Sequence, residues 1–454
     1  MRPYILLFLG LSLVYHSNLR PIGSTDTLGA SLTPMAIVLD HNVYLDRFGP
    51  WLYTHFPYSR GPLRQSRGHY FSGYPVADGI LAAPLYFPLA FVPGLRNWPP
   101  GSLVTLAVML QKFAATTVAA LASVVMLLLL ERITSRGWAW ALTLVYALAT
   151  PTWSISSQAM WQHGPGELAI AGTLLFLQRW SERRGSTDLW LCGACAACAL
   201  MVRPTNSLLL LALLAALAVS RAALREYLRF LVLPVAGGLL TMLFNLYVFG
   251  RPSGSQSIHE LTTPFLQGLA GVFLSPARGL LIYTPVAAFA LCAFLPAAGP
   301  ARRKHLALMT AAVSFAVLHL VVIAKWHDWW GGYCWGPRLL TEAMPALMVL
   351  MAVGVAAIQK PWPKRAFAVV AIYSCLIQAV GAYFYPKGYW DVVPLPAARA
   401  RERLWDWRDN PIRRTIMGGP DWEPYAIVGA AFSGGVPAAA RRMRELGANP
   451  YDRE

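Results

Sequence analysis

Apolar stretches of membrane-spanning length recur along the whole chain, separated by short polar loops. Their length and continuity predict transmembrane helices rather than strands or the buried helices of a soluble core. They lie near residues 3–17, 104–130, 138–156, 165–179, 189–202, 205–220, 228–249, 278–296, 305–324, 339–358 and 367–385. We expect the first to be a retained helix, because no small-x-small cleavage site follows it in "YHSNLRP".

One further apolar stretch, residues 80–95, is interrupted by Pro84, Pro88 and Pro93. Proline removes intrahelical hydrogen bonds, and lipid offers no substitute for them. The distribution of charge in the loops also indicates that residues 80–95 do not span the membrane. If residues 80–95 do not span and the N-terminus is cytoplasmic, the inside loops hold most of the loop lysines and arginines. We therefore expect an interfacial or re-entrant segment here, about eleven spans, and an extracytoplasmic C-terminus.

Composition agrees with an all-α polytopic membrane protein. Of the 454 residues, 56% are hydrophobic and only 13% are charged, about half the usual charged share of a soluble domain. The net charge is +17, but the sequence contains no basic stripe with interleaved aromatics, so nucleic acid is not expected as a partner. The expected organisation is a transmembrane domain over 1–385, with a long outer first loop at about 18–103. A polar extracytoplasmic tail, 386–454, follows.

The cysteines indicate packing rather than chemistry. Cys192, Cys195 and Cys198 recur every third residue and line one face of an expected helix. CxxC spacing can bind zinc, but neither a histidine nor a second pair accompanies it, and small residues suit helix packing in lipid. The sequence neither requires nor excludes a divalent metal.

The first outer loop contains the most notable acid, Asp26, in "GSTDTLGASLTP" just after the first apolar segment. A carboxylate at a membrane–water boundary can deprotonate a hydroxyl group or bind a metal. It can equally cap a helix, since Ser, Thr and Asp are common N-cap residues. Asp40 and Asp46 follow in the same loop.

A second concentration of polar and aromatic residues is "KWHDWWGGYCWGPRLLTEAMP" at 325–345. Tryptophans at the headgroup level can form an aromatic belt, which would not explain the glycines or the arginine. A guanidinium at the start of the next span suits a phosphate, and indoles can hold a sugar or an isoprenoid chain. The candidates for substrate binding in this loop are Lys325, His327, Asp328, Trp330 and Arg338.

Single ionisable residues mark the outer ends of other spans. Ionisable groups at such depths are costly unless they are paired or functional, although snorkelling to the surface is the alternative. Together they would place several cations around one outer cavity, which would suit a phosphorylated lipid. These candidates are Lys112, His163, Arg203 and Arg278.

Several motifs resemble those of GT-C glycosyltransferases that use polyprenyl-phosphate-linked sugars, a class that includes protein O-mannosyltransferases and lipid A aminoarabinose transferases. They are "STDTLGASLTPMAIVLD", "YPVADGILAAPLY", "WQHGP", "SPARGLLIYTP", "WWGGYCWGPRLLTEAMP" and, in the tail, "RLWDWRDNPI". The resemblance covers most of residues 15–345 and implies a GT-C-like fold with juxtamembrane helices in the first loop.

The resemblance further implies an inverting transfer in a bacterial plasma (inner) membrane. An acid of the first outer loop would be the general base, a role that falls on Asp26 by position, with Asp40 as the alternative. Basic residues, provisionally Arg338, Arg278 and Lys112, would hold the donor phosphate. The donor would be a polyprenyl-phosphate sugar, and the acceptor a cell-envelope glycan, lipid or protein. Many relatives pair the base with a second acid, whereas threonines flank Asp26 here.

Two other functions remain open from the sequence. A transporter or flippase of a lipid-linked sugar or glycan would bind phosphate through the same cations without any transfer. The halves of the chain lack paired Gly/Pro-broken helices, which weighs against alternating access. A non-catalytic membrane scaffold, with its tail recruiting partners, is the third interpretation.

Overall fold

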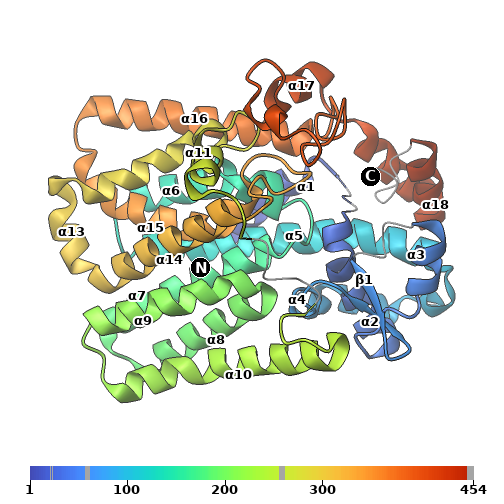
Figure 1. Cartoon of the computed structure of the whole chain (residues 1–454), viewed down its shortest axis with the longest axis horizontal. Coiled ribbons are helices and arrows are strands. Elements are labelled where there is room, and N and C mark those ends of the chain that lie inside the picture. The colour runs from blue at the N-terminus through green and yellow to red at the C-terminus, as the bar shows by residue number, and fades with distance from the viewer. Residues whose placement is uncertain (21, 23, 57–61, 255–260, 447–454) are drawn as a thin grey trace.

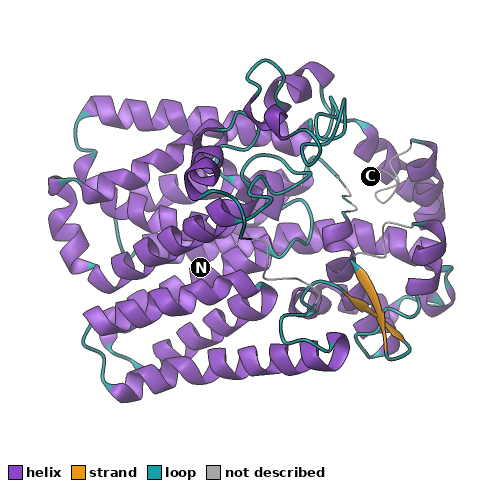
Figure 2. Ribbon diagram, in the orientation of Figure 1, coloured by secondary structure: helices purple, strands orange, loops and turns teal. Residues whose placement is uncertain are grey.

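The computed structural model describes residues 1–20, 22, 24–56, 62–254 and 261–446. Helices dominate this part of the chain, and many of them run roughly parallel in one bundle (Figures 1 and 2). The first loop and the tail lie at the same end of the bundle, because the Tyr425 hydroxyl of the tail donates to the Ser17 carbonyl. We call this end the first-loop end. The expected all-α polytopic fold is confirmed.

The bundle consists of long helices joined by short 3₁₀ turns and one π turn, which are labelled η. In chain order its elements are α1 (Arg2–His16), α5 (Pro100–Leu130), α6 (Arg136–Leu148), η5 (Thr152–Ser156), α7 (His163–Arg183), α8 (Ser186–Val202), η6 (Pro204–Ser207), α9 (Leu208–Val219), α10 (Leu224–Phe249), α11 (Phe265–Leu274), α12 (Leu280–Tyr283), η7 (Pro285–Phe294), η8 (Pro296–Ala298), α13 (Gly299–Lys304), α14 (Leu306–Lys325), η9 (Arg338–Ala343), α15 (Met344–Gly354), η10 (Val355–Ala357) and α16 (Pro361–Tyr383).

Helical structure occupies each of the eleven stretches predicted to span. Among the described residues, five helices are long and apolar enough to cross a membrane, and six if the bent pair Pro285–Phe294 and Pro296–Lys304 counts as one span. The chain is therefore a multi-pass membrane protein, while the number eleven stays a prediction. Residues 80–95 fall largely in the short apolar helix Ala77–Phe91.

The first loop folds into a small subdomain, as the predicted juxtamembrane helices require. Its elements are η1 (Thr25–Thr27), α2 (Leu28–Asp40), α3 (Gly49–His55), β1 (Leu63–Ser66), β2 (His69–Ser72), α4 (Ala77–Tyr86), η3 (Phe87–Phe91) and η4 (Leu95–Asn97). The strands pair antiparallel from Leu63–Ser72 to Ser66–His69. Arg67 and Gly68 form the two-residue turn with positive φ, the geometry that suits the twist of a hairpin.

The subdomain has its own apolar core, which includes Leu28, Met35 and Phe48 from the loop itself. Gly29 lets α2 contact β2, because a Cβ at this position would lie 1.9 Å from the Ser72 hydroxyl oxygen. The close approach fixes the start of α2, and with it η1, against the segment that follows β2.

The tail packs onto the first-loop end through η11 (Arg401–Trp405), α17 (Pro411–Gly418) and α18 (Glu423–Glu445). Ile427 and Met443 of α18 join the apolar core of the first loop. The Ser275 hydroxyl donates to the Leu404 carbonyl at 2.6 Å, which ties η11 to the end of α11.

The cysteines of α8 support packing. All six cysteines of the chain are unpaired, and the Cys195 sulfur lies 2.9 Å from the point where a Cβ on Gly172 of α7 would be. A glycine facing a cysteine brings α7 and α8 close together, as small residues do between helices in lipid.

Candidate functional site

Asp26 lies in η1, and its carboxylate is divided between two partners. The Tyr74 hydroxyl donates to Oδ1 at 2.7 Å, and Nη1 of Arg338 donates to Oδ2 at 2.7 Å. About 30% of the Asp26 side chain is exposed. Two contacts thus orient the carboxylate of a side chain that stays partly exposed.

The structure does not support helix capping by Asp26. The N-cap of η1 is Ser24, whose side chain accepts from the Asp26 amide, and the N-cap of α2 is Thr27. The carboxylate oxygens of Asp26 are directed to Tyr74 and Arg338 instead. The capping interpretation, which the sequence left open, is therefore wrong.

The ion pair with Arg338 controls the charge of Asp26. Burial acts to raise the pKa of the Asp26 carboxyl, but the charge of Arg338 and the hydrogen bonds from Tyr74 and Arg338 outweigh it. The pKa of Asp26 lies below its usual value as a result. His163 acts in the same direction, as the smallest of these causes. Asp26 is therefore ionised at neutral pH.

Arg338 begins η9, directly after the glycine-rich segment that the sequence singled out. Its guanidinium is largely buried, and its Nε makes no hydrogen bond among the described residues. Asp26 therefore uses only part of the donor capacity of this arginine. A guanidinium has five N–H donors, and the buried Nε of Arg338 leaves one of them unused among the described residues.

Glu342 joins two of the predicted residues, His163 and Arg203, in a buried cluster. It lies four residues after Arg338 in η9, and its Oε2 contacts Nδ1 of His163 at 2.9 Å and Nη1 of Arg203. His163 begins α7, and Arg203 is the C-cap of α8. Three distant segments thus meet at the fully buried carboxylate of Glu342. Since Arg338 and Glu342 both lie in η9, the partner of Asp26 and this cluster are about one helical turn apart.

Lys112 occupies a separate position near the middle of α5. Its ammonium group donates to the Ser157 carbonyl and to Oε1 of Gln158, both at 3.0 Å. The side chain is buried, and no carboxylate of the described residues forms an ion pair with it. A buried ammonium with only neutral partners is electrostatically uncompensated.

Arg278 is buried in a different pair, with a tail residue. Its Nη2 contacts Oδ1 of Asp391 and donates to the Gly332 carbonyl at 3.1 Å. The Tyr385 hydroxyl donates to the second carboxylate oxygen of Asp391 at 2.7 Å. The charge of Arg278 is therefore balanced within the protein.

The loop after α14 is less uniform than its composition suggests. His327 and Asp328 pair with each other at 3.0 Å and are partly exposed, and Lys325 at the end of α14 is partly buried. Trp330 is buried, with the Arg401 guanidinium 5.0 Å above its ring. The ion pair of Asp26 is with Arg338, and these four residues take no part in it.

The tryptophans of this loop do not form an aromatic belt. Trp329, Trp330 and Trp335 are each 5% exposed or less, so protein surrounds their rings. Trp335 packs edge-on against Tyr283 with ring centres 5.2 Å apart. The belt interpretation is therefore wrong for these three residues.

Asp40 lies at the opposite end of α2 from Asp26. Thirteen helical residues separate the two ends, a rise of about 20 Å. Both carboxylate oxygens of Asp40 are held by the Arg47 guanidinium. Asp40 lines an open cavity of about 400 Å³ with Asn42, Tyr44, Asp46 and Arg47. Asp26 and Asp40, the two candidate bases predicted from the sequence, therefore lie at different sites.

Two residues of these contacts were missed from the sequence: Glu342 and Asp391. Glu342 had a weak signal, because it is an acid four residues after Arg338 at the start of a predicted span, where an ionisable group is costly unless it is paired. Asp391 lies in a loop with no regular pattern, and its pairing with Arg278 spans 113 positions. Among the described residues, no group of three or more His, Cys, Asp or Glu side chains could hold a metal ion.

Comparisons with known proteins relate the chain to others by fold alone. No protein-family model matches it. No curated protein matches its sequence. Two solved structures resemble it over nearly its whole length. One is ArnT from Cupriavidus metallidurans bound to undecaprenyl phosphate, with 13% identity, a TM-score of 0.53, and coverage of 99% of this chain and 76% of that one.

The other is the archaeal oligosaccharyltransferase AglB from Archaeoglobus fulgidus, in complex with an inhibitory peptide and a dolichol-phosphate. It has 13% identity and a TM-score of 0.50, and the match covers 97% of this chain and 64% of AglB, so the chain spans less than two thirds of that protein. Both structures have the GT-C fold of membrane transferases. The chain described here therefore has the GT-C fold.

Proposed function

We propose that the chain is an integral membrane glycosyltransferase that moves a sugar from a polyprenyl-phosphate-linked donor to a hydroxyl acceptor with inversion. The observation that carries the proposal is the carboxylate of the partly exposed Asp26, held between Tyr74 and Arg338 at the first-loop end of a GT-C fold. The two similar structures support the class of donor, since one holds undecaprenyl phosphate and the other a dolichol-phosphate.

Asp26 is the general base of this proposal. Its carboxylate accepts the proton of the acceptor hydroxyl while that oxygen forms a bond to the anomeric carbon of the sugar. The bond between the anomeric carbon and the phosphate oxygen breaks, and its electron pair leaves with the polyprenyl phosphate. Tyr74 and Arg338 orient the carboxylate, so that the reacting groups meet in one geometry. Asp40 remains the alternative base, although Arg47 occupies both of its oxygens.

The donor phosphate requires cations that stabilise its negative charge as it departs. Lys112 suits this role best among the predicted cations, because the other buried ones, Arg203, Arg278 and Arg338, already contact carboxylates. Arg338 adds its unused donors from the side of Asp26. Arg203 and His163 would contribute through the cluster around Glu342. Lys325, His327, Asp328 and Trp330 would contact substrate further out, along the loop after α14.

We place the first-loop end on the extracytoplasmic side of a bacterial plasma membrane. Lysine and arginine are concentrated in the loops at the other end, such as the tract Arg302–Lys304, and such loops stay in the cytoplasm. The acceptor would then be a cell-envelope glycan, lipid or protein, reached at the outer face.

The proposal is tested with the purified full-length chain in liposomes that contain radiolabelled polyprenyl-phosphate sugars. A transferase releases free polyprenyl phosphate and labels an added cell-envelope acceptor fraction, in amounts that rise with both substrates. A transporter or flippase instead moves intact donor between leaflets when no acceptor is present. Movement of intact donor without any acceptor labelling, across a panel of donor sugars, would overturn the proposal.

The same assay has a matched internal control. Asp46→Asn removes an acid of the same loop that pairs with His69 and does not contact Asp26, and it should leave transfer unchanged. Loss of transfer in this variant would show that the assay reports loop folding rather than chemistry.

A further inference from the structure

The tail places an exposed apolar and basic surface beside the first-loop end of α16. The amide of Asp421 donates to the carbonyl of Tyr383, the last residue of α16, at 2.9 Å. α17 lies against the side of the bundle near this end of α16 (Figure 1). Since α16 is long and apolar enough to span, its end lies at a membrane boundary, and α17 lies at that boundary too.

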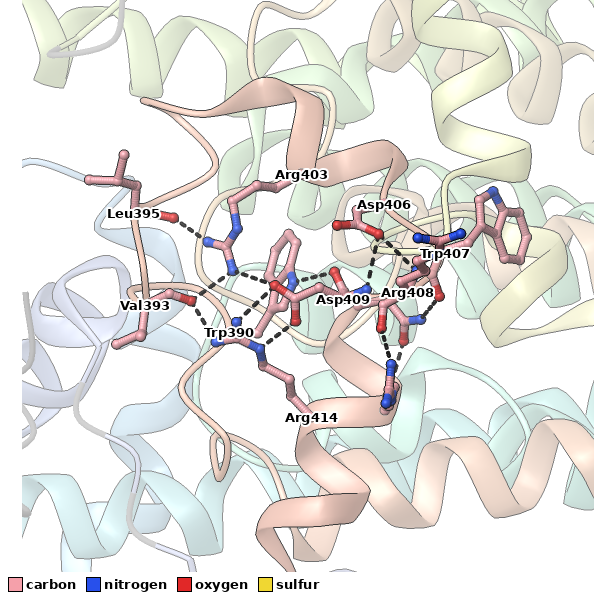
Figure 3. A network of polar contacts seen from close by, with 11 residues as sticks. Trp390, Val393, Leu395, Arg403, Asp406, Trp407, Arg408, Asp409 and Arg414 are labelled. Atoms are coloured by element: carbon pink, nitrogen blue, oxygen red, sulfur yellow. Dashed lines mark hydrogen bonds and ion pairs between the residues drawn. The ribbon is translucent and has the colours of Figure 1, made fainter.

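The segment before α17 is held in place by an ion-pair network (Figure 3). Arg414 contacts both carboxylate oxygens of Asp409, and Arg403 approaches the same carboxylate at 3.5 Å. Arg403 and Arg414 also donate to the Val393 carbonyl, at 2.8 and 2.7 Å. The Trp390 indole donates to the Asp409 carbonyl at 2.9 Å. The network therefore uses Asp409 internally and gives the segment one conformation.

Other side chains of this segment are directed away from the protein. Trp407 is 62% exposed, Ile416 50% and Met417 74%. Arg408 and Arg413 are exposed as well, and neither forms an ion pair with a carboxylate of the described residues. Residues 405–418 contain three arginines and two acids, a net charge of 3 − 2 = +1. Nη1 of Arg413 donates to the Arg408 carbonyl at 2.6 Å. Exposed apolar side chains and two exposed arginines without a carboxylate partner among the described residues thus occur on the same short segment.

A tryptophan, two aliphatic side chains and two arginines are the composition of a membrane interface. Indoles prefer the headgroup level, apolar side chains enter the boundary with the acyl chains, and arginines bind the phosphates. Positive charge on such a surface is complementary to anionic phospholipid headgroups. A tail that extended into water would leave the same apolar side chains hydrated.

We propose that residues 405–418, which we call the tail platform, lie on the membrane at the first-loop end and bind anionic phospholipid headgroups through Arg408 and Arg413. Trp407, Ile416 and Met417 enter the boundary between headgroups and acyl chains. The proposal does not depend on the proposed transferase function, because it uses only the packing of the tail against α16 and the exposed side chains.

The test measures the depth of a nitroxide spin label on Met417→Cys in the full-length chain, reconstituted in vesicles of phosphatidylethanolamine and phosphatidylglycerol. Labelling is compared with that of the parent chain, whose six cysteines are buried or half-buried. Collision rates with oxygen, which partitions into lipid, and with a water-soluble nickel chelate report the depth. A label on Arg441→Cys, an exposed position of α18, is the reference.

The platform predicts an oxygen-to-nickel ratio at position 417 several-fold above that at position 441. Arg408→Glu with Arg413→Glu should lower the ratio at position 417 toward the reference value. The matched control, Arg441→Glu with Arg444→Glu at two exposed positions of α18, changes charge equally and should leave the ratio at position 417 unchanged. Equal ratios at positions 417 and 441 would overturn the proposal and show that the surface faces water or a protein partner.

A further outcome separates the two parts of the proposal. If the label at position 417 lies in lipid but Arg408→Glu with Arg413→Glu leaves its depth unchanged, headgroup binding by these arginines is overturned. Size-exclusion profiles of all variants establish that each is folded before its depth is compared.

Discussion

Asp26 and Arg338 are 312 positions apart in the chain, yet Oδ2 of Asp26 and Nη1 of Arg338 lie 2.7 Å apart. The contact joins the first loop to the start of η9 and leaves the second carboxylate oxygen to Tyr74. An acid that was conspicuous in the sequence for its isolation is thus one of the most constrained side chains of the first loop. This constraint lets a single carboxylate serve as an oriented base without a second acid beside it.

Arg338→Met should lower transfer about tenfold to a hundredfold, because Asp26 would lose the partner that orients its carboxylate. The variant also removes the main charge that lowers the pKa of Asp26, so that this pKa should rise. The measurement is the pH dependence of kcat/KM. The acid limb of the Arg338→Met profile should lie at higher pH than that of the wild type.

Arg338→Lys is the matched variant, since it keeps the positive charge and changes the geometry. Its acid limb should stay close to that of the wild type even where its rate falls. Superimposable profiles for Arg338→Met and the wild type would show that Arg338 does not set the charge of Asp26.

The lowered pKa of Asp26 also predicts how its contribution to stability depends on pH. An unperturbed aspartate titrates near pH 4, and the pKa of Asp26 lies below its ordinary value, so its charge is retained down to about pH 4. A lowered folded-state pKa stabilises the protein above the unfolded pKa, and this contribution disappears as pH falls through the folded value. The difference in melting temperature between the wild type and Asp26→Asn should therefore be constant from pH 8 to pH 5 and shrink below about pH 4. A difference that disappears by pH 6 would contradict the ion pair.

Lys112→Met should separate binding from stability. Loss of a charged hydrogen-bond donor to phosphate should raise KM for the lipid donor about ten- to a hundredfold. The same change removes a buried ammonium that lacks a carboxylate partner, so the melting temperature should stay equal or rise. Donor titration and thermal unfolding in the same detergent measure the two effects. A lower melting temperature with unchanged KM would make Lys112 structural.

The Arg278–Asp391 pair should contribute mainly to stability. Asp391→Asn leaves a buried guanidinium without its anion and should cost about 3–5 kcal/mol of unfolding free energy. The matched control is Glu182→Gln, which breaks the partly exposed pair with Arg132 and should cost less than about 1 kcal/mol. Chemical denaturation of both variants provides the comparison. Equal losses of unfolding free energy in the two variants would show that the buried pair stabilises the protein no more than the partly exposed one.

The sequence predicted the helical bundle because membrane spans carry their signal locally, in runs of apolar residues. It also identified the cations, since a charge near a membrane span stands out from its neighbours. Pairings were harder, because Glu342 and Asp391 are ordinary acids until folding places them against His163 and Arg278. No local pattern encodes a contact across more than a hundred positions.

The number of spans was also beyond local signals. Several predicted spans are divided by short turns, such as η6 before α9 and the bend after η7, and their helices fall below the length that spans alone. Prolines at the start of these elements, Pro204 and Pro296 among them, interrupt the intrahelical hydrogen bonds. Whether such a helix crosses the bilayer depends on its neighbours.

The central claim, that Asp26 is the base, is tested most directly by the single-turnover transfer rate of Asp26→Asn with a radiolabelled polyprenyl-phosphate sugar and saturating acceptor. Asparagine keeps the shape of the side chain and cannot accept the proton, so the rate should fall about 10²- to 10⁴-fold while the donor still binds with wild-type affinity. Asp40→Asn, measured alongside, should retain most of its activity. A wild-type rate in Asp26→Asn, with the loss appearing in Asp40→Asn instead, would contradict the account.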